Sequence, residues 1–312
     1  YLGDREFSIP IIASPMDTIS ETEMAKAMGN MGGLAVLHRY NSITEQQRMA
    51  KEVVSHSDWS GQVAAAIGVT GDYLERAEAL IAVGTDILCI DVAHGHHMLV
   101  RKALTTLRKA FDHKTHKIHL MAGNVATLEA FDALASWGAD SVRVGIGGGS
   151  ICSTRIVTGH GVPTLQSVME CAKSSYDTKI IADGGIKTSG DIVKALAAGA
   201  DFVMIGSMLA GTEESPGDVR ATLNGEKFKE YRGMASKEAQ RDWRGKSSTP
   251  EGVATMVPYR GSVNAILADI EGGIRSGLSY TGARSINELQ AKAELILQSS
   301  AAQMESNTHI LW

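Results

Sequence analysis

The sequence has 312 residues, of which 44% are apolar, so it is long enough for two average domains or for one large α/β barrel. A formal net charge of −5 argues against partners such as nucleic acid or an acidic membrane, and no apolar run approaches the roughly 18 residues of a membrane span. Three cysteines without close spacing argue against a disulfide framework and a zinc site, and favour a reducing, cytoplasmic setting.

Eight short, nearly continuous apolar runs alternate with longer amphipathic segments over the first two-thirds of the chain, as strands covered on both faces do. The runs are Ile9–Ser14, Leu34–His38, Val63–Val69, Ile87–Ala93, Ile118–Asn124, Ser141–Ile146, Lys179–Gly185 and Phe202–Met208. Helical patterns lie between most of them, at Thr22–Met31, Tyr73–Val83, Leu128–Trp137, Leu165–Lys173 and Ser189–Ala198. Glycines that end helices, such as Gly84, Gly138 and Gly199, precede the next strand. The pattern predicts an α/β fold, the (β/α)8 TIM barrel, with a doubly wound open sheet as the alternative.

Polar or Gly-rich residues follow the predicted strands, and a barrel carries its chemistry at these carboxyl ends. They are Ser14-Pro-Met-Asp17, His38-Arg39, Asp91 with His94-Gly-His-His97, Gly123-Asn124, Asp183-Gly-Gly185 and Gly206-Ser207. The segments after the seventh and eighth strands are the usual phosphate site of such barrels. Backbone N–H groups at Asp183-Gly-Gly185 and Gly206-Ser207, with the Ser207 hydroxyl, therefore predict a phosphate site.

The most unusual stretch is the loop 145–155, in which four of the first five residues are glycine. Cys152 follows these glycines, hydroxyl residues surround it, and the cation Arg155 comes soon after. A nearby positive charge favours the thiolate, so Cys152 is a candidate nucleophile. The alternative is a Gly-rich turn with a small buried cysteine. Cys89 lies in an apolar run and Cys171 in a helical pattern, which predicts packing roles for both.

The histidines offer a second kind of candidate site. His94, His96 and His97 could bind a metal, but the spacing lacks a carboxylate partner and a cysteine, so solvated or substrate-facing side chains are favoured. His113, His116 and His119 flank the start of a strand and are predicted at the surface.

The pattern changes after the last strand, at 231–260. A polar stretch, Lys237–Gly252, reads as poor in helix. A long excursion at this point of a barrel is usually a lid, so a mobile flap is predicted, with a disordered surface loop as the alternative. Ser262–Ser276 and Ser285–Leu297 then read as two helices that complete the cover of the barrel.

Several motifs together resemble the IMP dehydrogenase/GMP reductase family, in the right order and over nearly the whole chain. They are Ser14-Pro-Met-Asp-Thr18, Gly145-Ile-Gly-Gly-Gly-Ser-Ile-Cys152, Ala182-Asp-Gly-Gly-Ile186, Gly206-Ser-Met-Leu-Ala-Gly-Thr-Glu-Glu-Ser-Pro-Gly217 and Tyr231-Arg-Gly-Met234. The resemblance implies one catalytic barrel over residues 1–312. The regulatory CBS pair common in the family is absent, since only Val53–Gln62 lies where it is inserted. Because the chain starts at Tyr1 rather than Met, we expect its N-terminus to be incomplete.

The resemblance also implies a role for each matching residue. Cys152 would attack C2 of the purine, with Thr154 and Glu251 assisting proton movement. The substrate-binding set would be Ser14, Met16, Ser150, Asp183, Gly184, Gly185, Gly206, Ser207, Tyr231, Gly233 and Met234. Asp183 would hold the ribose, Met234 and Glu251 would contact the base, and the serines, Tyr231, Gly185 and Gly206 would cradle the 5′-phosphate. The cofactor set would be Asp91, Asn124, Arg143 and Gly145, and a monovalent cation such as potassium would meet carbonyls of Gly147, Gly149 and Cys152.

Two reactions of the family are open, with IMP, GMP or XMP as ligands and NADPH or NAD as cofactor. Core motifs such as Ser14-Pro-Met-Asp17 are similar to those of IMP dehydrogenases, which oxidise IMP to XMP. The flap reads Gln240-Arg-Asp-Trp-Arg-Gly-Lys246, without the Arg-Tyr pair by which dehydrogenases activate water. Arg241 and Arg244 are candidates to replace it, but neither aligns cleanly. Because the flap carries the distinguishing step, GMP reductase is the preferred interpretation and IMP dehydrogenase the alternative.

Two further hypotheses come from other classes. A flavin-dependent barrel also places Asp-Gly-Gly and Gly-Ser after its last strands, although the Cys152 loop has no flavin role. A catalytically inactive sensor would bind IMP or GMP without turnover. The resemblance also implies a homotetramer.

Overall fold

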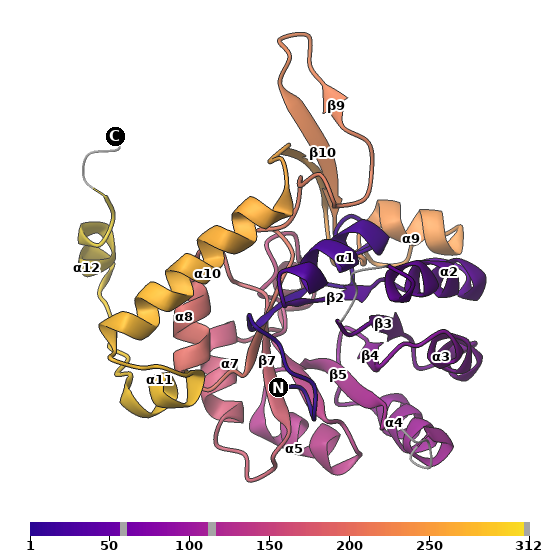
Figure 1. Cartoon of the computed structure of the whole chain (residues 1–312), viewed down its shortest axis with the longest axis horizontal. Coiled ribbons are helices and arrows are strands. Elements are labelled where there is room, and N and C mark those ends of the chain that lie inside the picture. Colours follow the sequence, from indigo (N-terminus) through magenta and orange to yellow (C-terminus); the bar gives the residue numbers. More distant parts are fainter. Residues whose placement is uncertain (57–60, 112–116, 309–312) are drawn as a thin grey trace.

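Eight parallel strands, β1 to β8, close into a barrel in chain order in the computed structural model, which describes residues 1–56, 61–111 and 117–308 (Figure 1). The strands are β1 Ile11–Ala13, β2 Leu34–Leu37, β3 Ala64–Ile67, β4 Ile87–Asp91, β5 His119–Val125, β6 Ser141–Val144, β7 Lys179–Asp183 and β8 Phe202–Ile205. Strand β1 pairs in parallel with both β2 and β8, so the sheet has no free edge. The barrel prediction is confirmed, and the open doubly wound sheet is excluded.

Helices follow strands β1 to β7, and all of them except the short α6, which buries no residue, cover the outside of the barrel. They are α1 Thr22–Asn30, α2 Ile43–Val54, α3 Tyr73–Ala82, α4 Met98–Phe111, α5 Leu128–Ser136, α6 Thr154–Thr158, α7 Thr164–Cys171 and α8 Ser189–Ala197. Gly84, Gly138 and Gly199 all have positive φ just beyond α3, α5 and α8, as the sequence predicted. A left-handed residue ends a helix at little cost when it is glycine.

The core has two layers because side chains of each strand alternate between the barrel interior and the helices. Ile12 belongs to the cluster inside the barrel, whereas its neighbours Ile11 and Ala13 pack outside. The N-terminal segment closes the interior: Leu2 is fully buried there, and Phe7 meets Phe202 edge to face at 5.5 Å. The N-terminal segment therefore fills the amino-terminal end of the barrel interior.

The flap contains more structure than the sequence predicted. Strands β9 Arg220–Ala221, β10 Lys227–Arg232 and β11 Ala254–Pro258 form an antiparallel sheet, and its β9–β10 part projects from the body (Figure 1). Helix α9 (Lys237–Arg244) begins at Ser236, whose side chain accepts from the Ala239 amide, and ends at the left-handed Gly245. The prediction of a helix-poor stretch was therefore wrong, since capping at both ends stabilises a very polar helix.

The last helices complete the cover of the barrel. Helix α10 (Val263–Tyr280) packs on α8 and α1 and is longer than predicted, while α11 (Ile286–Lys292) also packs on α8 and ends five residues earlier than predicted. Helix α12 (Ser300–Glu305) stands apart from the barrel (Figure 1). Within the described ranges, no helix is both long and apolar enough to cross a membrane.

One surface prediction was wrong, and two lie outside the described residues. His119, at the start of β5, is only 2% exposed, and its Nε2 lies 2.8 Å from Ser141 Oγ. His113 and His116 are outside the described residues, as is part of the predicted CBS insertion point at 57–60.

Candidate active site

A cavity of about 570 Å³ opens at the carboxyl ends of the strands, and it is lined by every residue to which the resemblance assigned a role. These are Ser14, Met16, Asp91, Asn124, Arg143, Gly145, Gly147, Gly149, Ser150, Cys152, Thr154, Asp183, Gly184, Gly185, Gly206, Ser207, Tyr231, Gly233, Met234 and Glu251. Their positions in the chain span most of the barrel. The fold therefore brings the predicted site residues together in one cavity.

A hydrogen-bonded chain leads from the candidate nucleophile into the flap. Cys152 Sγ lies 3.2 Å from Thr154 Oγ1, and that hydroxyl donates to Glu251 Oε2 at 2.8 Å. The backbone supports this contact, because the Ser153 amide donates to the Glu251 carbonyl at 2.9 Å. A thiol, a hydroxyl and a carboxylate connected in this order can pass a proton from sulfur to carboxylate as the sulfur attacks.

Arg155 does not supply the positive charge that its position next to the loop suggested. Its guanidinium donates to the carbonyls of Val162 at 2.6 Å and Ile146 at 3.5 Å, where it closes the loop rather than meeting Cys152. The polar partner of the thiol is Thr154. The two other cysteines are buried, and burial raises the pKa of both Cys89 and Cys171 to about 12, which agrees with packing roles.

Asp183, at the end of β7, is held by a fixed set of donors. Asn124 Nδ2 donates to its Oδ2 at 2.8 Å, and Arg143 donates to the same oxygen from Nε at 3.1 Å and Nη2 at 2.9 Å. No described residue donates to the other oxygen, Oδ1. One carboxylate oxygen is thus fixed by protein and the other is left for a ligand hydroxyl.

Arg143 also joins this group to Asp91 at the end of β4. Its Nη1 donates to Asp91 Oδ1 at 2.7 Å, and Arg39 Nε lies 3.5 Å from Asp91 Oδ2. Burial alone would raise the pKa of Asp91, but attraction to Arg143 and Arg39 outweighs it and lowers the pKa below its usual value. Asp91 therefore stays ionised in the cavity wall. The sequence places Arg39 at the carboxyl end of a predicted strand but assigns it no role, because its proximity to Asp91 exists only in the closed barrel.

The opposite side of the cavity gathers backbone and hydroxyl groups around Gly206. A side chain at Gly206 would lie 3.2 Å from Met16 Sδ, 3.3 Å from the Tyr231 hydroxyl and 3.5 Å from Ser14 Oγ. Ser150 Oγ lies 3.4 Å from the same Tyr231 hydroxyl. A Cβ at this position would crowd the Met16 sulfur and the Tyr231 hydroxyl, so glycine leaves the backbone of residue 206 open to the cavity.

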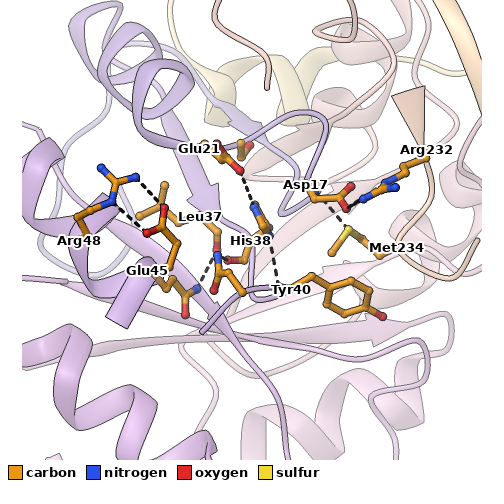
Figure 2. Close-up of polar contacts among 12 residues, drawn as sticks. Asp17, Glu21, Leu37, His38, Tyr40, Glu45, Arg48, Arg232 and Met234 are labelled. Atoms are coloured by element: carbon orange, nitrogen blue, oxygen red, sulfur yellow. Dashed lines mark hydrogen bonds and ion pairs between the residues drawn. The ribbon is translucent and has the colours of Figure 1, made fainter. Parts of the chain in front are cut away.

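The flap is attached to the barrel next to this cavity (Figure 2). Arg232 donates to Asp17 Oδ2 from Nε at 3.0 Å and Nη2 at 2.7 Å, and the Asp17 amide donates to Met234 Sδ at 3.3 Å. On α9, the indole of Trp243 stacks on Tyr40, with ring centroids 5.8 Å apart. The loop after β1 therefore holds the end of β10, and the loop after β2 holds helix α9.

The histidine loop after β4 does not take part in the cavity. His94 and His97 are exposed, and His96 packs against Trp137 with ring centroids 5.7 Å apart. Across the described residues, no group of three or more His, Cys, Asp or Glu side chains could hold a metal ion. The metal alternative for this loop has no support, and solvent exposure agrees with the favoured interpretation.

Comparison with known proteins places this site in a family. The model of the IMP dehydrogenase / GMP reductase domain matches residues 4–309. The chain belongs to the IMP dehydrogenase/GMP reductase family. Enzymes of this family are NAD(P)-dependent oxidoreductases that bind purine nucleotides.

Named relatives come from both branches of the family. The chain is similar to inosine-5′-monophosphate dehydrogenases of Nitrosopumilus maritimus, at 49% identity over 79% of the chain, and Streptococcus pyogenes, at 42% over 93%. It spans 54% and 60% of their lengths, a little over half. A solved structure, GMP reductase of Trypanosoma brucei in complex with guanosine 5′-monophosphate, matches with a TM-score of 0.89 at 30% identity, covering 98% of this chain and 91% of that one.

Proposed function

We propose that the chain is a purine-nucleotide oxidoreductase that reduces GMP to IMP with NADPH, through a covalent bond between Cys152 and C2 of the purine. The observation that carries this proposal is the chain of contacts Cys152–Thr154–Glu251. A thiol must lose its proton to attack, and an amine must gain one to leave as ammonia. The same three side chains serve both needs, because Glu251 can take the thiol proton through Thr154 and return it to the departing nitrogen.

The remaining lining residues fit the parts of a nucleotide. The free Oδ1 of Asp183 suits a ribose hydroxyl, while Ser14, Ser150, Ser207, Tyr231 and the open backbone at Gly184, Gly185 and Gly206 suit the 5′-phosphate. Met16, Gly233 and Met234 line the cavity between these ends and suit the base. A dianionic phosphate bound through hydroxyls and N–H groups gives the substrate one orientation, with its C2 toward the thiol.

The cofactor residues have the chemistry that a nicotinamide requires. NADPH, when bound, supplies the hydride that reduces C2. Asp91 and Arg143 form an ion-paired wall beside Asp183, Asn124 lies in the same wall, and Gly145 offers backbone without a side chain. This wall can position a carboxamide ring by hydrogen bonds while excluding water from C2. For a monovalent cation such as potassium, the Gly147, Gly149 and Cys152 carbonyls remain the candidate ligands, and that of Gly149 also accepts the Cys152 amide.

The direction of the reaction depends on the flap. Hydrolysis of the covalent intermediate needs an activated water molecule, whereas reduction needs only a proton for ammonia and a hydride. Glu251 and Thr154 are in contact with the thiol and supply the proton. Of the two arginines considered as substitutes for the Arg-Tyr pair, Arg244 lines the cavity and Arg241 does not.

IMP dehydrogenase remains the second candidate, since the named relatives at 42–49% identity are dehydrogenases and Arg244 reaches the cavity. Paired assays test the proposal: GMP with NADPH, and IMP with NAD, followed at the nicotinamide absorbance band with product analysis. Reduction of GMP to IMP supports the proposal, and sustained formation of XMP from IMP contradicts it. In that case Arg244→Ala, with Arg241→Ala as the matched control, shows whether Arg244 activates the water.

The remaining functional expectations follow from the same proposal. A flavin enzyme would have no use for a thiol in contact with a proton relay, and a sensor would not need one. A homotetramer and a cytoplasmic location accompany the proposal as expectations, which sedimentation and cell fractionation test directly.

A further inference from the structure

Two cations bind carbonyl oxygens of the loop that follows β8, where the phosphate site is proposed. Lys229, in β10, is only 2% exposed, although lysines are almost never fully buried without a charged partner. Its ammonium donates to the carbonyls of Thr212 at 3.1 Å and Glu213 at 3.3 Å, and also to that of Ser215. These three residues belong to the loop, so Lys229 fastens β10 to it.

The burial of Lys229 has a cost in free energy. Removal of the ammonium from water lowers the pKa of Lys229, and attraction to Glu214, Asp218 and Glu213 opposes this change without cancelling it. The three carbonyl contacts offset part of the cost, and an apolar side chain of the same length would leave these carbonyls without their donor. The lysine therefore holds the loop in one shape.

Arg260, just after β11, reaches the beginning of the same loop. Its side chain is exposed, and Nη1 donates to the carbonyls of Met208 at 3.2 Å and Ser207 at 3.4 Å. The Arg260 amide also donates to the Gly211 carbonyl at 2.8 Å. Strand β10 and the segment after β11 thus each contribute one cation to the loop.

The contacts of Arg260 fix the direction of peptide groups at the proposed phosphate site. In a planar trans peptide, the C=O of one residue and the N–H of the next point in opposite directions. The Ser207 carbonyl, held toward Arg260, therefore turns the Met208 amide away from it, and the Gly206 carbonyl is likewise fixed by the Leu209 amide at 2.9 Å. Within the described residues, the amides of Ser207 and Met208 donate no hydrogen bond, so both are free for a ligand.

Lys229 acts on a second part of the same site through its strand. Lys229 and Tyr231 are two residues apart on β10 and are both buried, so they share one face of the strand. The Tyr231 hydroxyl reaches Gly206, where it would lie 3.3 Å from an added Cβ. By fixing β10 against the loop, Lys229 therefore also sets the place of this hydroxyl.

We propose that Lys229 and Arg260 are positioning residues that hold the loop after β8 in the shape that binds the 5′-phosphate of the substrate. This inference rests on the phosphate site of the proposed function, and not on the direction of the reaction. Neither cation lines the cavity, so both act through the loop and not by contact with the ligand.

The test compares binding of IMP with binding of inosine, which differs from IMP only in lacking the 5′-phosphate. Calorimetric titration of the intact chain measures both affinities without turnover. Lys229→Met should weaken IMP binding by about tenfold or more and leave inosine affinity within about twofold, because only the phosphate meets the displaced groups. The matched control is Lys227→Met, which changes an exposed lysine of the same strand and should alter neither affinity.

Arg260 gives an independent variant that does not disturb the core, since its side chain is exposed. Arg260→Met should weaken IMP binding by about threefold or more, again without a matching loss for inosine. Arg260→Lys keeps a cation that can bind the same two carbonyls and should restore most of the IMP affinity. If Lys229→Met does not fold, the two Arg260 variants decide the inference.

Unchanged IMP affinity in either methionine variant, an equal loss for IMP and inosine, or failure of Arg260→Lys to improve on Arg260→Met would overturn the inference. These outcomes are separate from failure of the proposed function. A chain that forms XMP steadily, but whose methionine variants lose affinity for IMP alone, retains the inference and loses the reductase assignment. A chain that reduces GMP, but whose variants bind IMP normally, does the reverse.

Discussion

The three cysteines have the same side chain but very different surroundings. Cys89 and Cys171 are buried, with the pKa of each raised to about 12, so almost none of either is thiolate near neutral pH. Cys152 is half-buried, lines the cavity and contacts a hydroxyl connected to a carboxylate. Its environment, and not its residue type, distinguishes it.

Selective alkylation of Cys152 follows from this difference. Iodoacetamide should modify Cys152 first, and saturating GMP should slow the modification. Cys152→Ala should abolish turnover while nucleotide affinity changes by less than about tenfold, since phosphate contacts do not need the thiol. Peptide mass spectrometry and nucleotide titration check these results, with Cys171→Ala as the control that keeps activity. Near-normal kcat in Cys152→Ala would remove the nucleophile from the account.

Glu251 is expected to matter through its proton. Glu251→Gln keeps the shape and a hydrogen bond to Thr154 but cannot accept the thiol proton, so kcat for GMP reduction should fall by about 10²-fold or more. The matched control is Glu238→Gln, which changes an exposed glutamate of α9 outside the cavity. Steady-state kinetics distinguish the two variants, and equal activity in both would show that Glu251 does not transfer the proton.

The elements of the flap are held by a few polar contacts. Arg232 at the end of β10 bonds to Asp17 in the loop after β1 (Figure 2). It also bonds to Asp242 on α9 at 2.6 Å. The side chains of Arg232 and Asp17 are only 16% and 11% exposed, so loss of the arginine would leave a mostly buried carboxylate unpaired. The position of the flap therefore depends on Arg232.

Arg232→Met should lower the free energy of unfolding by about 2 kcal/mol and speed tryptic cleavage within α9, because a buried charge without its partner is costly. The control is Arg275→Met, which removes an exposed pair with Glu271 on α10 and should cost about 0.5 kcal/mol at most. Urea denaturation and timed proteolysis measure both effects. Equal cleavage rates in the two variants would show that Arg232 does not anchor the flap.

Prediction from sequence worked best for the strands and their carboxyl ends. Continuous apolar runs identify buried parallel strands, and once eight of them close in order, residues as distant as Ser14 and Ser207 must share one opening. Helix α9 was missed because its residues are polar, although Ser236 and Gly245 were visible cap signals. The contacts of Arg39 and Trp243, and the burial of His119, depend on neighbours distant in sequence and could not be read locally.

The ion pairs of Arg143 with Asp91 and Asp183 lie at the carboxyl end of the barrel. A buried histidine, His119, lies at the start of β5, near the opposite end. Burial lowers the pKa of His119 from 6.5 to about 4; Asp140 opposes the change, and Arg5, Arg108 and Lys117 reinforce it. The folded chain thus binds a proton at His119 less readily than the unfolded chain does. The folded state therefore has its full stability with respect to this group above pH 6.5, and it loses stability as the pH falls toward 4.

Acidification across this range should therefore cost up to about 3 kcal/mol of unfolding free energy through His119 alone. Urea denaturation at several pH values measures the slope, and His119→Gln should flatten it. The exposed His94 provides the control, since His94→Gln should leave the slope unchanged. A His119→Gln variant with the slope of the unmodified chain would assign the acid sensitivity to other groups.

Formation of the covalent intermediate tests the central claim most directly. The chain is mixed with IMP and NAD, NADH is followed by stopped flow, and the quenched protein is digested to locate any purine adduct. The account predicts a burst of about one NADH per site with the adduct on the peptide that contains Cys152, followed by little further turnover, because nothing in the relay of Thr154 and Glu251 activates water as an Arg-Tyr pair does. Absence of both burst and adduct, or steady release of XMP after the burst, would contradict it.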